Sequence, residues 1–131
     1  MIPLTVLGAA YIALGLWCAA SPESTAASVG FSLTGGSGRS EWVTVYGGLQ
    51  TGLGIAMIVC GLTPNLKLGG LAFAAIFSCG LVLFRTPTLL AMQVKPLTYG
   101  FAATEVLSAA WLIYAYFAAA KAAVAPTPPL T

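Results

Sequence analysis

The sequence contains no histidine and very few charged residues. Charged side chains make up only 6% of its 131 residues, whereas soluble domains carry about 25%. With so few charges the chain is unable to build a water-soluble surface, so its exposed surface must face lipid. Because histidine is the commonest metal ligand and general base, its absence argues against hydrolases, deaminases and haem-binding proteins.

Cysteine and basic residues are also sparse. Cys18, Cys60 and Cys79 lie singly inside apolar runs, and no CxxC motif occurs. Such cysteines are typical of small buried hydrophobic residues rather than of a disulfide or a metal site. The net charge is +2 and no Lys/Arg-rich run is present, so nucleic acid is not expected as a partner. The sequence predicts neither a metal nor a cofactor.

What the chain has instead is long apolar stretches. A membrane-spanning helix needs about 20 mostly apolar residues, and four stretches of this kind run over about 3–20, 41–62, 66–84 and 97–120. They do not alternate as barrel strands do, and in lipid the helix is the state that pairs the backbone. We therefore predict an all-α transmembrane four-helix bundle, a single domain over 1–124 with a Pro-rich disordered tail over 125–131.

The first stretch has a second interpretation as a signal peptide. Cys18-Ala19-Ala20 faintly resembles a cleavage site, but no basic residue precedes the apolar run, as a signal sequence requires. We therefore expect a retained membrane helix.

The connections between the stretches differ in character. In the long first loop, Ser21 and Pro22 are typical of a helix start and predict a short interfacial helix over about 23–29. Residues 34–38 predict a flexible hinge. The two prolines of the segment 85–96 predict a loop between the third and fourth helices.

Four crossings place both termini and the turn at 63–65 on one side of the membrane. Lys67, Lys121 and the terminal amine on that side nearly balance Arg39, Arg85 and Lys95 on the other. If carboxylates engage the two arginines, only Lys95 is free to set the orientation. We therefore expect both termini in the cytoplasm, in a bacterial inner membrane.

Tryptophans mark the membrane surface on the long-loop side. Trp17 ends the first stretch and Trp42 begins the second. Because tryptophan concentrates at membrane–water interfaces, both are expected in an aromatic belt there.

Polar residues collect toward the same side of the predicted bundle. At about 1.5 Å rise per residue, Gln50 and Glu105 lie roughly 12–14 Å below that surface. In a structural role Glu105 pairs with Arg85 or Arg39, and Gln50 bonds a neighbouring backbone. In a binding role Glu105 titrates, and Gln50, Tyr46 and an arginine bind a polar head group. The predicted cluster, structural or ligand-binding, consists of Arg39, Glu41, Tyr46, Gln50, Arg85 and Glu105.

Glycines are concentrated in the second predicted helix. Small residues let membrane helices approach closely, so a helix-packing role is predicted for Gly47, Gly48, Gly52, Gly54 and Gly61. Among these, Gly48 and Gly52 form a GxxxG pair that packs either inside the bundle or against a second subunit.

The segment from Arg39 through Tyr46-Gly47-Gly48-Leu49-Gln50 to Gly52-Leu53-Gly54, with Arg85 and Glu105 in later helices, resembles a known family. It is similar to the bacterial family called domain of unknown function 4345. The resemblance covers nearly the whole chain and implies a small four-helix membrane protein, without an assigned activity.

One departure from that family is visible. Its members place an arginine nearer the tyrosine, where this chain has Trp42 or Val43. A looser likeness to DoxX-type four-helix bundles, some of which accompany quinone-linked redox enzymes, rests on architecture alone.

No catalytic motif is present, so an enzyme is not expected. The favoured hypothesis is a non-enzymatic accessory or scaffold subunit, which contacts the lipid bilayer and other membrane subunits or copies of itself. An alternative is a binder or carrier of a small amphipathic molecule, a quinone or a lipid, at the polar cluster. A small proton-coupled transporter is the second alternative, although four helices leave little room for inverted repeats.

Overall fold

The computed structural model describes residues 2–124, and within this range the chain is helical without strands. Four of the described segments are long and apolar enough to cross a membrane, namely Ile2–Ala20, Gly35–Leu62, Pro64–Ala91 and Pro96–Val124. The predicted all-α class with four spanning helices is therefore confirmed. The predicted disordered tail over 125–131 lies outside the described residues.

The first two spans flank a short helix. The first span is α1 (Ile2–Ala20), and α2 (Pro22–Ser28) follows it as the predicted interfacial helix, with Pro22 in its first turn. The second span consists of three consecutive helical pieces, which are α3 (Gly35–Trp42), the π-helix η1 (Val43–Leu49) and α4 (Gln50–Leu62).

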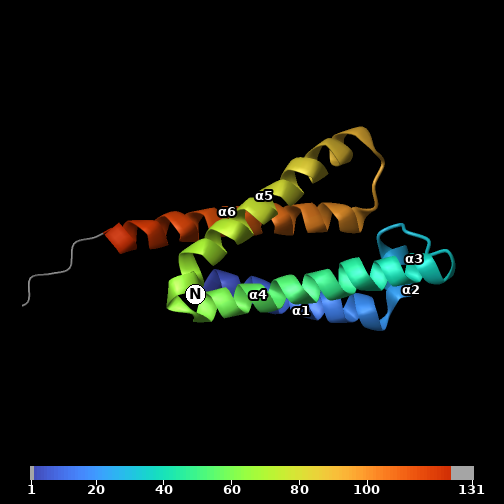
Figure 1. Cartoon of the computed structure of the whole chain (residues 1–131). Coiled ribbons are helices and arrows are strands. Elements are labelled where there is room, and N and C mark those ends of the chain that lie inside the picture. Colours follow the sequence, from blue (N-terminus) through green and yellow to red (C-terminus); the bar gives the residue numbers. More distant parts are fainter. Residues whose placement is uncertain (1, 125–131) are drawn as a thin grey trace, which may run out of the picture.

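The last two spans follow a short turn. The 3₁₀ turn η2 (Pro64–Leu66) leads into α5 (Lys67–Ala91). After a short loop α6 (Pro96–Val124) returns to the side on which α1 begins (Figure 1).

The start of the second span differs from the prediction. Residues 34–38 were expected to form a hinge before a helix that begins near 41, but α3 already begins at Gly35. Gly35 has a φ of +63°, a conformation that glycine adopts without strain. This left-handed residue turns the chain directly into the helix, so the glycine-rich segment continues the span instead of separating it from the loop.

The end of the third span also differs from the prediction. Pro87 was expected to break the chain into a loop after 84, but α5 continues through it to Ala91. The hydroxyls of Thr86 and Thr88 donate to the backbone carbonyls of Val82 and Arg85, each over 2.7 Å. These hydroxyl bonds are further contacts within the helix on either side of Pro87, and membrane helices tolerate proline more readily than soluble ones.

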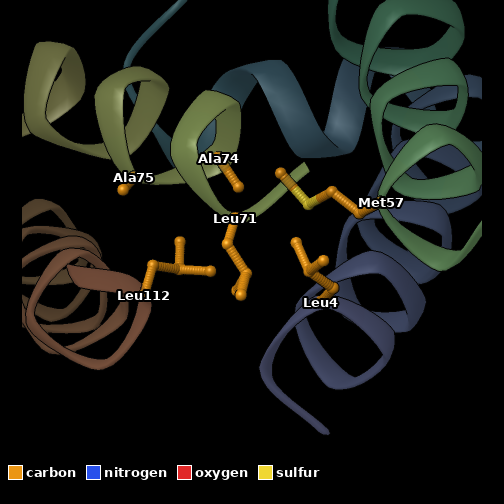
Figure 2. Packing of buried hydrophobic residues seen from close by; sticks show 6 residues of the cluster. All are labelled: Leu4, Met57, Leu71, Ala74, Ala75 and Leu112. Atoms are coloured by element: carbon orange, nitrogen blue, oxygen red, sulfur yellow. The ribbon is translucent and has the colours of Figure 1, made fainter. Parts of the chain in front are cut away.

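The spans associate as two pairs that meet at one end. The first pair is α1 beside α4, the second is α5 beside α6, and α5 leans away from α4 toward the loop before α6 (Figure 1). A single apolar cluster joins all four helices near the α4–α5 turn, where Leu71 lies between Leu4 of α1 and Leu112 of α6 (Figure 2). These three leucines are the largest fully buried side chains among the described residues.

The α1–α4 contact is a backbone-to-backbone approach through glycines. A Cβ built on Gly8 would lie 2.6 Å from the Gly54 carbonyl oxygen, and one built on Gly15 would lie 2.8 Å from that of Gly47. Any side chain at these positions would collide with the facing backbone. Gly47 and Gly54 therefore pack as the sequence predicted, and Gly61 is buried as well.

The predicted GxxxG pair lies on a different face. Gly48 and Gly52 are exposed, and a Cβ on Gly52 would meet none of the described atoms within 4 Å. This pair does not pack inside the bundle, which leaves lipid or a second subunit as its environment. The α1 glycines that do form the seam, Gly8 and Gly15, were not singled out from the sequence.

The seam predicts a contrast between two alanine substitutions. The Gly54→Ala side chain would lie 2.5 Å from the Gly8 carbonyl oxygen, so we expect it to lower the free energy of unfolding by about 1–3 kcal/mol. Gly52→Ala adds the same atom to an open face and should leave stability unchanged or slightly raised. Thermal unfolding of the two variants in detergent, followed by circular dichroism, measures the difference. Equal unfolding midpoints would contradict the close α1–α4 contact at Gly54.

Candidate functional site

The strongest polar interaction in the membrane-spanning part joins α5 to α6. Arg85 donates from Nε and Nη2 to the two carboxylate oxygens of Glu105, over 2.5 and 2.7 Å. The side chains are 30% and 15% exposed, respectively. Both groups lie inside segments long and apolar enough to span a membrane, where an unpaired charge is costly. Of the two partners that the sequence offered to Glu105, the structure selects Arg85.

Apolar grooves flank this ion pair. One groove of about 490 Å³ lies between α5 and α6 and is lined by Arg85, Glu105 and otherwise mostly aliphatic side chains, including Leu89 and Val106. A second, of about 580 Å³, lies along α5 and is also lined by Arg85. The guanidinium group therefore belongs to the walls of both grooves, so a polar group stands at the edge of two apolar surfaces.

Further polar side chains approach the pair from the α1–α4 side. Tyr11 of α1 is close enough to interact electrostatically with Glu105, and its ring meets the ring of Phe77 in α5 edge-on, with 6.1 Å between centroids. Tyr46 interacts in the same way with Arg85. The ring contact of Tyr11 with Phe77 is thus a point at which α1 of the first helix pair meets α5 of the second.

Gln50 is the other deep polar residue of the prediction. Its Oε1 atom is buried and has no hydrogen-bond partner among the described residues. A buried amide oxygen without a donor is destabilising by about 1–3 kcal/mol. Gln50 therefore offers an acceptor that the chain itself does not use.

The remaining members of the predicted cluster lie elsewhere. Arg39 contacts Glu23 of α2 at 3.3 Å, and both side chains are more than half exposed. Glu41 is exposed as well. The structure therefore separates the predicted cluster. Arg39 belongs to a surface ion pair with Glu23, and Glu41 is exposed. Arg85 pairs with Glu105, and neither Tyr46 nor Gln50 lines the grooves beside that pair.

The prediction that Trp42 belongs to a lipid-facing belt is wrong. Its side chain is only 5% exposed, its indole N–H donates to the hydroxyl of Thr25 over 3.1 Å, and its ring stacks on that of Tyr46 with 4.1 Å between centroids. Trp17, by contrast, is 56% exposed. Through its hydrogen bond with Thr25, Trp42 connects α2 to the second span, and it packs against the ring of Tyr46.

Tyr46 also lies in an unusual backbone. It belongs to the π-helix η1, and π-helical segments are rare and frequent at functional sites. The wider turn changes the direction in which the side chains before Gln50 leave the helix. No sequence signal marks this segment beyond its glycines, because its hydrophobic pattern is compatible with an ordinary α-helix.

A lysine connects the loop between α5 and α6 to α2. Lys95 donates from Nζ to the carbonyl oxygen of Ala27 over 2.7 Å. Gly30 follows with a φ of +92°, and the Cε atom of Lys95 lies 3.9 Å from the place where a Cβ of Gly30 would be. This contact holds the two helix pairs together on the side opposite the apolar cluster.

Metal-ligating residues do not gather in the described part of the chain. No group of three or more His, Cys, Asp or Glu residues lies close enough together to hold a metal ion. The three cysteines are free thiols.

Comparison of the chain with protein-family models, curated proteins and solved structures gives no significant match. The resemblance to the domain of unknown function 4345 family accordingly stays a prediction, and the function is argued from the site.

The inner ion pair predicts strong energetic coupling. Arg85→Met and Glu105→Leu alone each leave a charge unpaired, so each should lower the free energy of unfolding by about 2–4 kcal/mol. The double variant removes both charges and should be more stable than the sum of the single effects predicts. Unfolding by dodecyl sulfate in mixed micelles measures all four proteins.

The surface pair is the matched control for this cycle. Because Arg39 and Glu23 are well exposed, Arg39→Gln should change stability by less than about 1 kcal/mol. Additive single effects at Arg85 and Glu105 would show that the two side chains do not form a coupled pair.

Proposed function

We propose that the protein is a non-enzymatic integral membrane protein that binds a small amphipathic molecule along the α5–α6 groove, with the polar head of the molecule at Arg85 and Glu105. The observation that carries the proposal is the position of this ion pair, which lies in the wall of an otherwise mostly apolar groove within the membrane-spanning segments. A site that is apolar with a few convergent polar groups is typical of small-molecule binding.

The dimensions of the groove support this function. Its volume of about 490 Å³ falls within the range of about 300–1,000 Å³ in which small ligands bind. Leu90, Leu107 and Val106, which line it, are all more than half exposed, so an acyl or isoprenoid chain would find an apolar surface there. The ion pair in the wall of the same groove supplies the polar contact for a head group.

The access route to the groove supports a membrane-borne molecule over a water-soluble one. The groove-lining side chains lie on α5 and α6, which pair with each other along an edge of the bundle (Figure 1). A molecule dissolved in the bilayer would enter sideways without crossing a polar surface. Because access is from the bilayer, a quinone or a lipid is the favoured class of ligand.

Substitution inside the groove tests this function. Ala103 lines the groove, so the larger side chain of Ala103→Phe should fill it and remove most of any bound amphiphile. Native mass spectrometry of the protein, extracted with a mild non-ionic detergent, measures how much hydrophobic material of defined mass remains bound.

Ala110→Phe is the matched control, because Ala110 is also an exposed alanine of α6 and does not line the groove. We expect the Ala110→Phe variant to retain the bound molecule that the Ala103→Phe variant loses. A wild-type protein without any bound molecule, or equal losses in both variants, would contradict the proposed function.

A second candidate, an accessory subunit of a membrane complex, is favoured by one observation. Gly48 and Gly52 present a GxxxG face that is open, and small-residue faces let another helix approach closely. Binding of an amphiphile along α5–α6 and assembly through this face of the second span use different surfaces, so the two functions are compatible.

We further propose that both termini lie in the cytoplasm of a bacterial cell. On the long-loop side Arg39 and Arg85 are each paired with a glutamate, while Lys67 and Lys121 on the other side form no ion pair within the described residues. Since uncompensated Lys and Arg favour the cytoplasmic side, a C-terminal fluorescent reporter should fold and a C-terminal alkaline phosphatase should stay inactive. The reverse pattern would overturn this orientation.

A further inference from the structure

The Arg85–Glu105 pair is electrically complete. Both carboxylate oxygens of Glu105 accept a hydrogen bond from Arg85, so the negative charge meets the positive one across two parallel contacts. Bidentate pairs of this kind are the strongest that arginine makes with a carboxylate. A molecule that approaches the pair therefore meets a polar but neutral unit.

Hydrogen-bonding capacity nevertheless remains at the site. A guanidinium has five N–H donors, and two of the Arg85 donors go to Glu105, so the others are free for a ligand acceptor. Arg85 is also the more exposed member of the pair, at 30% against 15%. Arg85, which lines both grooves, is thus a hydrogen-bond donor whose positive charge Glu105 already compensates.

No further charge is available in the walls of the grooves. Among the described residues that line them, Arg85 and Glu105 are the only ionisable side chains apart from hydroxyl groups. An anionic head group would add a negative charge beside Glu105, with no second cation to balance it. In a medium of low dielectric constant such a charge is strongly disfavoured.

The unused donors of Arg85 set the second requirement. They call for an acceptor, and a hydroxyl or carbonyl oxygen supplies one without adding charge. Because Arg85 lines both grooves, such a head group would meet these donors in either groove. Uncharged polar chemistry therefore fits both the charge balance and the donors of the site.

From this balance we infer that the site selects an uncharged amphiphile whose head carries hydroxyl or carbonyl groups, and that Glu105 is the residue that excludes anionic amphiphiles. The inference rests on the proposed function, because it names the class of molecule that the groove takes. It assigns Glu105 a part in specificity that is separate from its part in stability.

Two probes with the same oleoyl chain and glycerol backbone test the inference. Monooleoylglycerol is uncharged, and monooleoylglycerol phosphate is anionic. Tritiated forms of both are titrated onto the full-length protein in a neutral detergent, and binding is read by scintillation proximity. The wild-type protein should bind the uncharged probe at least about tenfold more tightly, a factor that corresponds to about 1.4 kcal/mol.

Glu105→Gln is the decisive variant, because it keeps the size of the side chain and removes its charge. Arg85 then carries an uncompensated positive charge, so the preference should reverse and the anionic probe should bind more tightly by about tenfold. Glu23→Gln removes one charge from the exposed pair with Arg39 and should leave the preference unchanged. Circular dichroism and size-exclusion chromatography check that each variant is folded.

The outcomes separate the two proposals. Stronger binding of the anionic probe by the wild-type protein, or an unchanged preference in a folded Glu105→Gln variant, would overturn the assignment of specificity while the groove remained a binding site. The proposed function itself would be overturned if the two probes did not compete with each other and if Ala103→Phe left their binding unchanged. If Glu105→Gln does not fold, Glu105→Asp is the substitute variant, because it keeps the charge. Glu105→Asp should retain the preference for the uncharged probe. A preference of Glu105→Asp for the anionic probe would also overturn the assignment of specificity.

Discussion

An arginine and a glutamate inside apolar helices must neutralise each other, and this constraint shapes the second half of the bundle. Arg85 and Glu105 meet through two hydrogen bonds, which fixes α5 against α6 at a point where the two pairs of helices no longer share an apolar cluster. The pair needs α5 to remain helical beyond its predicted end, because Arg85 otherwise would lie in a loop. The threonines beside Pro87 donate to carbonyls in that stretch.

A different force holds the first half together. Gly8 and Gly54 bring the backbones of α1 and α4 into contact, and the van der Waals packing that such close approach permits is one source of attraction between helices in lipid. The two halves then meet around Leu71. Since this cluster lies at one end only, the other end depends on polar contacts such as the Lys95–Ala27 bond. The Arg85–Glu105 pair lies toward that end as well.

The four spans and the interfacial helix were predictable, because hydropathy over about 20 residues reports directly on what lipid requires. The continuation of α5 through Pro87 was not, since a proline ordinarily ends a helix and the sequence does not reveal that Arg85 has a partner on α6. The choice of Arg85 over Arg39 is set by helix pairing, which composition does not reveal. Trp42 was misplaced because a tryptophan at a span end is typical of a belt, whereas its burial depends on the tertiary contacts with Thr25 and Tyr46.

The central claim is that Arg85 and Glu105 form a closed, neutral unit within the membrane. Solid-state nuclear magnetic resonance of the full-length protein in lipid bilayers tests it directly, by dipolar recoupling between ¹⁵N in the Arg85 side chain and ¹³C in the Glu105 carboxylate. Strong coupling is expected, as the 2.7 Å contact of Nη2 with Oε1 requires, together with the chemical shift of an ionised carboxylate. Absent coupling or a protonated Glu105 would contradict it.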